Sequence, residues 1–104
     1  MSPFTGNGEA GYRVIYSAVV RQELTRLRAG LADAAAVQRF DVALRTIATR
    51  LKKDPLVFGE PRNHLENLRL AIRVASVRPL FVSYAVHDER PLVFVRFFRL
   101  LGGR

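Results

Sequence analysis

The spacing of the apolar residues changes partway along the chain, and no other feature constrains the fold as strongly. Between residues 17 and 53 apolar side chains recur every three or four positions, which is typical of amphipathic helices. Between residues 68 and 98 they mostly alternate with other side chains, which is typical of strands. The pattern predicts an α+β fold, with helices first and a mainly antiparallel, twisted sheet after them.

Two helices are expected in the first half of the chain. Ser17 and Asp33 are suitable N-caps for them, and Asp54-Pro55 ends the second helix because proline disfavours helical geometry in the residue before it. The short connection between the two helices predicts an antiparallel helical hairpin. The two apolar stripes are Val20, Leu24, Leu27, Leu31 and Val37, Phe40, Leu44, Ile47, Leu51.

Four strands are expected, over residues 12–16, 68–75, 80–87 and 92–98, with a loop at 56–67 and a turn at Ser76–Pro79. The element order is then β-α-α-β-β-β, a two-layer sandwich with the helical hairpin on one sheet face. We expect the aliphatic residues of 68–74 to face the helices. The open face would then carry Arg69, Arg73, Phe81, Ser83, Phe94, Arg96 and Phe98.

The chain has 104 residues, the size of one domain, and we assign residues 12–101 to it. Residues 1–11 and 102–104 are expected to be tails, the first of them disordered. Because the chain has no cysteine and only two histidines, disulfides and thiolate metal sites are excluded, and we expect no metal or cofactor. No apolar run is long enough to cross a bilayer, so we expect a cytoplasmic protein with no membrane contact.

The charge balance predicts an anionic partner. Lysine and arginine number 17 against nine acidic residues, which gives a net charge of +8. All but two of the cations are arginine, whose planar, forked donors suit phosphate and carboxylate groups. Nucleic acid and an acidic protein both remain open as partners. The arginines of the helices lie off both apolar stripes, and we interpret them mainly as a solvated helix face.

Several segments in this order resemble a known family. They are the helical hairpin ending in Asp54-Pro55, then Gly59-Glu60-Pro61, the arginine-bearing strand 68–74, and Arg78-Pro79 leading through strand 80–86 to Val93-Phe94-Val95. Together they resemble the RelE/ParE toxins of bacterial type II toxin–antitoxin systems, often called plasmid stabilisation proteins. The similarity covers about residues 12–101.

The resemblance implies a small toxin that inhibits growth and is neutralised by a cognate antitoxin. RelE-like members cleave messenger RNA at the ribosome, whereas ParE-like members poison DNA gyrase. The chain has Phe81 where the ribonucleases usually place an arginine, and it lacks their terminal tyrosine. These departures favour ParE-like behaviour slightly, and both targets stay open. The alternative is a catalytically inactive interaction module that binds a partner or forms a homodimer through the open sheet face.

Candidate site residues fall into three groups. If the ribonuclease activity is retained, the catalytic candidates are Arg73, Arg78 and His87, with Glu60, His64, Glu66 and Tyr84 as weaker acid–base candidates. Target phosphates would be bound by Arg69, Arg73, Arg96 and Arg99. Three phenylalanines left uncovered would favour association, so a partner protein would be bound by Phe81, Phe94 and Phe98.

Overall fold

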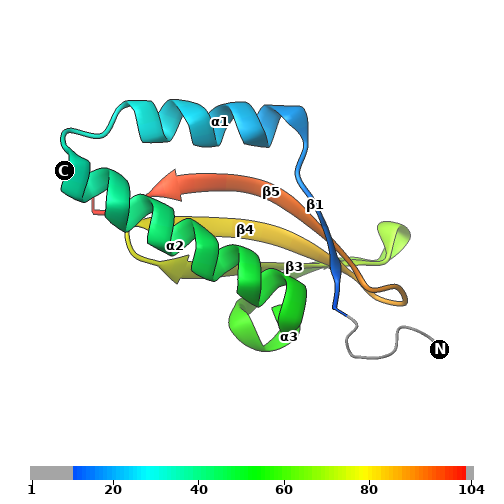
Figure 1. Cartoon of the computed structure of the whole chain (residues 1–104). Helices are drawn as coiled ribbons and strands as arrows, with labels where there is room; N and C mark the ends of the chain where they lie inside the picture. The colour runs from blue at the N-terminus through cyan, green and yellow to red at the C-terminus, as the bar shows by residue number, and fades with distance from the viewer. Residues whose placement is uncertain (1–10, 103–104) are drawn as a thin grey trace.

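The computed structural model describes residues 11–102, which form three α-helices and one five-stranded sheet. The helices lie against one face of the sheet, as predicted (Figure 1). The predicted tails fall outside the described residues except for Gly11 and Gly102. In chain order the elements are β1 (Arg13–Ile15), α1 (Ala18–Ala29), α2 (Ala34–Lys53), α3 (Pro55–Phe58), β2 (Glu60–Leu65), the 3₁₀ turn η1 (Glu66–Leu68), β3 (Leu70–Val77), β4 (Leu80–His87) and β5 (Leu92–Leu100).

The helix boundaries confirm the predicted capping signals. The Ser17 hydroxyl accepts a hydrogen bond from the Val20 N–H at 3.1 Å, and the Asp33 carboxylate accepts one from the Ala36 N–H at 2.8 Å. Helix α2 ends at Lys53, and Pro55 begins the short helix α3. Within residues 11–102, none of the helices combines the length and apolar character needed to cross a membrane.

The sheet has the strand order β1-β5-β4-β3-β2, and only the β1–β5 pair is parallel. The mainly antiparallel sheet is therefore confirmed. The prediction of a loop over residues 56–67 is wrong, because α3, β2 and η1 occupy this segment. All six residues of β2 are exposed, so this edge strand is held by backbone pairing with β3 and has no buried face that would produce an alternating pattern.

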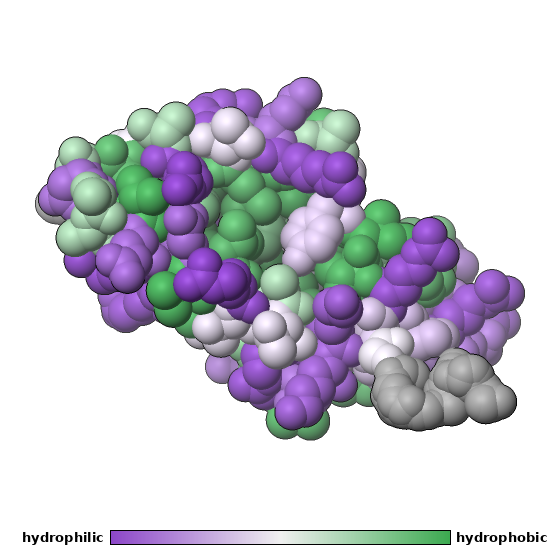
Figure 2. Space-filling view, in the orientation of Figure 1, coloured by the Kyte–Doolittle hydropathy of each residue, from purple (hydrophilic) through white to green (hydrophobic). Residues whose placement is uncertain are grey.

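The hydrophobic core lies between the helices and one sheet face. Helix α1 contributes Val20, and α2 contributes the larger share of the buried side chains. Apolar surface remains visible between α1 and α2, bordered by hydrophilic side chains (Figure 2). The two helices diverge from their connection (Figure 1), and α1 has fewer buried residues than α2. The buried core residues include Phe40, Ala43, Ile47 and Leu51 of α2 and Leu80, Val82, Tyr84, Val86, Val93, Val95 and Phe98 of the sheet.

The face assignment predicted for β3 is wrong. Strands β3 and β4 are joined by only two residues, so Val77 lies opposite Leu80, and Arg73 lies opposite Tyr84. Directly opposed residues share a face, so Ala71, Arg73, Ala75 and Val77 point toward the helices. Leu70, Ile72 and Val74 point to the open face instead. The prediction placed the larger aliphatic residues of β3 toward the helices on the basis of their alternation alone. Pairing across the turn, whether two or four residues long, places Ala75 on the same face as Leu80 instead.

The face assignment predicted for the end of β5 is also wrong, because the strand contains an irregularity. Up to Val95 the pairing with β4 follows the predicted alternation, but the register shifts between Ser83 and Tyr84, which leaves Arg96 as an extra residue. Phe98 then lies opposite Val82 in the core, with 2% of its surface exposed. Phe97 takes the place on the open face that was predicted for Phe98.

Candidate binding face of the sheet

A cluster of cationic and aromatic side chains lies on the open sheet face, on neighbouring strands β4 and β5. The Cζ atom of Arg99 lies 4.7 Å from the centroid of the Phe97 ring, and that of Arg96 lies 5.6 Å from it. The rings of Phe81 and Phe97 are 6.3 Å apart. Arg96 also donates a hydrogen bond from Nη1 to the Ser83 hydroxyl at 2.9 Å. Phe97 therefore lies close to two guanidinium groups and to a second aromatic ring.

The surroundings of this cluster are mostly apolar. Ile72 and Ala85 are buried although they face away from the helices, and Ser83 is 1% exposed beneath the Arg96 guanidinium. Phe94 is half-buried beside Ala85. Ile15, which pairs with Phe94, is exposed at the edge of this face. The open face thus combines two exposed arginines, Arg96 and Arg99, with a continuous apolar strip.

Arg73 lies in a different environment from the one predicted. Its side chain points to the helix-covered face, and Nη2 donates hydrogen bonds to the carbonyl oxygens of Leu56 at 2.7 Å and Gly59 at 2.6 Å. These carbonyls belong to α3 and its C-cap, so the guanidinium holds the short helix against the sheet. The placement of Arg73 on the open face beside the other phosphate-binding candidates is therefore wrong.

Arg69 and Arg78 also lie away from the cluster. Arg69 follows η1, just before β3, in the left-handed region at φ 56°, and its side chain forms an ion pair with Glu89. The prediction that Arg69 lies on a strand is therefore wrong. Arg78 is exposed in the turn between β3 and β4 and lines a hollow together with residues of α2. Neither arginine meets Arg96 or Arg99 in a common site.

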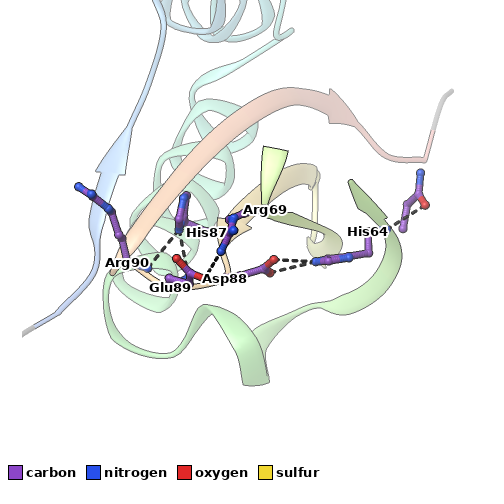
Figure 3. A network of polar contacts seen from close by, with 7 residues as sticks. His64, Arg69, His87, Asp88, Glu89 and Arg90 are labelled. Carbon is purple, nitrogen blue, oxygen red and sulfur yellow. Dashed lines mark hydrogen bonds and ion pairs between the residues drawn. The ribbon is translucent and has the colours of Figure 1, made fainter. Parts of the chain in front are cut away.

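Both histidines belong to a polar network where β4 meets β5 (Figure 3). The Nδ1 atom of His87 accepts hydrogen bonds from the backbone N–H groups of Glu89 and Arg90, at 3.0 and 3.1 Å. These bonds use the Nδ1 lone pair that a general base needs, and in the neutral ring Nε2 then carries the proton. His87 thus stabilises the turn between β4 and β5.

His64 reaches the same network from β2. Its Nε2 atom lies 2.8 and 3.0 Å from the two carboxylate oxygens of Asp88. Arg69 joins the network through Glu89 and through its carbonyl oxygen, which accepts the Asp88 N–H at 2.8 Å. These contacts connect the edge hairpin of β2 and β3 to the turn after β4. The network lies at the end of the strands, away from the Arg96–Phe97–Arg99 cluster.

The other acid–base candidates are not assembled into a site. Glu60 and Glu66 are exposed on β2 and η1. Tyr84 is fully buried, and its hydroxyl donates a hydrogen bond to the Pro55 carbonyl oxygen at 2.6 Å. Burial raises the pKa of Tyr84 above its ordinary value, although Arg73 nearby acts in the opposite direction. Tyr84 is therefore a core residue that also holds α3.

No protein-family model matches this chain, and no curated protein matches it either. Within residues 11–102, no three acidic or histidine side chains come together as a metal site would require. The residue that sequence reasoning missed is Phe97, which lies at the centre of the cluster on the open face. Its signal was present, because two consecutive phenylalanines, Phe97 and Phe98, break the alternation of the strand.

Proposed function

We propose that this protein is the toxin of a type II toxin–antitoxin pair with a RelE/ParE-like fold, and that it acts by binding its target rather than by cleaving RNA. The observation that carries the proposal is the Arg96–Phe97–Arg99 cluster on the sheet face opposite the helices, which α1 borders through Val19 and Glu23. Such a face offers planar cations and apolar area to a protein target. A gyrase-poisoning activity fits this arrangement better than an mRNA endoribonuclease.

The positions of the predicted catalytic residues favour binding over catalysis. Cleavage of RNA through its own 2′-hydroxyl needs a base, an acid and cations around one phosphate. Arg73 is bound to backbone carbonyls on the other face, and His87 accepts two backbone N–H groups through Nδ1. Arg96 and Arg99 therefore have no histidine or carboxylate candidate of the predicted set beside them.

The antitoxin is expected to bind the same face. An apolar strip on a monomer favours association unless a partner covers it, and the two arginines select a partner segment with carboxylates. The proposed antitoxin segment is therefore extended or helical, apolar on one side and acidic along its border. It would bury Phe81, Phe94 and Phe97 and pair with Arg96 and Arg99. Toxin action and neutralisation would then compete for one surface.

Expression of the chain alone in a bacterium tests the proposal. We expect growth arrest with double-strand breaks and an SOS response, and intact transcripts. Arg99→Glu and Phe97→Ser should relieve the arrest, whereas Arg90→Glu, a charge reversal in the turn outside the cluster, should not. Arrest with cut transcripts would contradict the binding mechanism, and undisturbed growth at confirmed expression would contradict the toxin function.

The apolar strip also supports a second candidate, an inactive interaction module that forms a homodimer. Directly opposed apolar side chains cross four strands of the open face, from Ile15 through Phe94 and Ala85 to Ile72. In a two-fold dimer the same strip of the two copies would meet. Light scattering at micromolar concentration distinguishes this candidate: a dimer that Phe94→Ser converts to a monomer, together with normal growth on expression, would favour the module.

A further inference from the structure

Helix α2 presents a second cationic surface, on the side opposite the core. The buried side chains of α2 define one side of the helix, and at 100° per residue the opposite side is centred near Val42 and Thr49. This outer face consists of exposed residues only, and we call it the α2 outer face. Its members are Ala35, Gln38, Arg39, Val42, Arg45, Thr46, Thr49, Lys52 and Lys53.

The charges of the α2 outer face are all of one sign. It carries four cations and no carboxylate, and none of the four forms an ion pair within residues 11–102. Two carboxylates border the face. Asp41 is held by Arg28 at 2.9 Å, with Arg45 also lowering its pKa, and Asp54 is held by Arg50 at 2.7 Å. The excess positive charge of the helix is therefore concentrated on its solvent side.

The cations lie along both sides of a ridge of small or uncharged side chains. Residues Gln38, Val42 and Thr49 follow one line along the helix. Arg45 and Lys52 lie on one side of this line, and Arg39 and Lys53 lie on the other. Near the start of the helix, Arg78 joins Gln38 and Arg39 around a hollow of about 370 Å³. From Arg39 to Lys53 the cations extend over about 21 Å.

We propose that the α2 outer face binds duplex DNA, with the ridge of Gln38, Val42 and Thr49 in the major groove. An α-helix fits a B-form major groove about 12 Å wide, and cations on both sides of the ridge then reach phosphates of the two strands. Gln38 and Thr49 on the ridge then face the base edges, to which amide and hydroxyl groups can hydrogen-bond, and Thr46 beside the ridge adds a neutral donor of the kind that contacts phosphates. The A-form major groove of duplex RNA is too narrow to admit a helix.

This surface lies on the helix side of the molecule, apart from the open sheet face, so the inference does not depend on the proposed function. It predicts DNA binding even if expression of the chain leaves growth undisturbed. If both hold, the protein would contact a protein target through the sheet and DNA through α2.

Fluorescence anisotropy with the full chain and a labelled 24-base-pair DNA duplex tests the inference. Each phosphate contact contributes a slope of about −0.9 to the dependence of log affinity on log salt. Arg45→Gln combined with Lys53→Gln should reduce the slope by about two and weaken binding roughly fiftyfold at about 0.1 M salt. Arg13→Gln combined with Arg21→Gln removes the same charge from outside α2 and should change the affinity less than about threefold.

Three results with nucleic acid would overturn the inference. They are equal affinity for duplex RNA of the same sequence, an equal loss of affinity in the two double variants, and no binding to the DNA duplex at about 0.05 M salt. Binding to vesicles containing anionic lipid that exceeds binding to DNA would also contradict it. Circular dichroism of each variant checks that the helices are still folded. We expect that they are, because all four substituted side chains are exposed.

Discussion

The two faces of the sheet use arginine in opposite ways. On the helix-covered face, Arg73 donates to the carbonyl oxygens of Leu56 and Gly59, so its charge is used inside the fold. On the open face, Arg96 and Arg99 rest on the Phe97 ring and remain exposed. The difference shows what determines the role of an arginine here. An arginine that finds backbone carbonyl oxygens to donate to stabilises the fold, whereas one without them stays available to another molecule.

The largest effect is expected from two neighbouring phenylalanines on opposite faces. Phe98→Ala should lower the free energy of unfolding by about 3–5 kcal/mol, because it leaves a cavity in the core. Phe97→Ala should cost less than about 1.5 kcal/mol, because the ring is only partly buried. Chemical denaturation of both variants measures the difference. A larger loss in Phe97→Ala than in Phe98→Ala would mean that the register shift near Arg96 is absent.

How much of this comparison was predictable depends on how local its causes are. The helix caps Ser17 and Asp33 and the alternation of β4 are set by neighbours in sequence, and these predictions are confirmed. The face of β3 depends on the length of one turn, and the face of Phe97 depends on one extra residue in β5. The alternation of residues within a single strand reveals neither the turn length nor the extra residue. The face of β3 can nevertheless be inferred from that of β4, because the length of the turn between them fixes which residues lie opposite one another.

The candidate site was likewise predictable only where its causes are local in sequence. Phe81, Phe94 and Arg96 lie on the open face as the strand pattern indicated. Arg99 also lies there, but only because of the extra residue in β5. The partners of Arg73 come from α3, a four-residue helix that follows a proline and has no periodic signal. The histidine contacts similarly join β2 to a distant turn. Contacts of this kind follow from the tertiary arrangement, so no pattern of residues in the sequence predicts them.

A matched pair of arginine substitutions sharpens the comparison. Arg73→Met keeps the apolar stem but removes the donor to two carbonyl oxygens, and it should lower the free energy of unfolding by about 1–3 kcal/mol. Arg99→Met removes an exposed cation–π contact and should cost less than about 1 kcal/mol. Thermal and denaturant unfolding of both variants measures this. A larger loss in Arg99→Met would reverse the assignment of the two faces.

Tyr84→Phe tests the covered face through its pH dependence. At neutral pH the variant should be less stable by about 0.5–1.5 kcal/mol, because the Pro55 carbonyl oxygen loses its donor. Burial raises the pKa of Tyr84 in the folded state, so its contribution is fully present below pH 10 and is lost as the pH rises through the raised pKa. The gap between wild type and variant should therefore narrow above pH 10, while Tyr16 is common to both proteins. A constant gap would contradict the buried environment.

The smallest effect is expected at the outer edge of the covered face, where Arg28 of α1 bonds to Asp41 of α2 through two contacts of 2.9 Å. The hydrogen bond from Arg28 lowers the pKa of Asp41, so this contribution is present above the ordinary aspartate pKa and is lost as the pH falls through the lowered value. Asp41→Asn should flatten the acid side of the stability profile slightly, and Arg28→Gln should do the same. Because both substitutions break the same ion pair, the double variant should lose no more stability than either single variant. Fully additive losses would mean that α1 and α2 are held together by packing on the sheet alone.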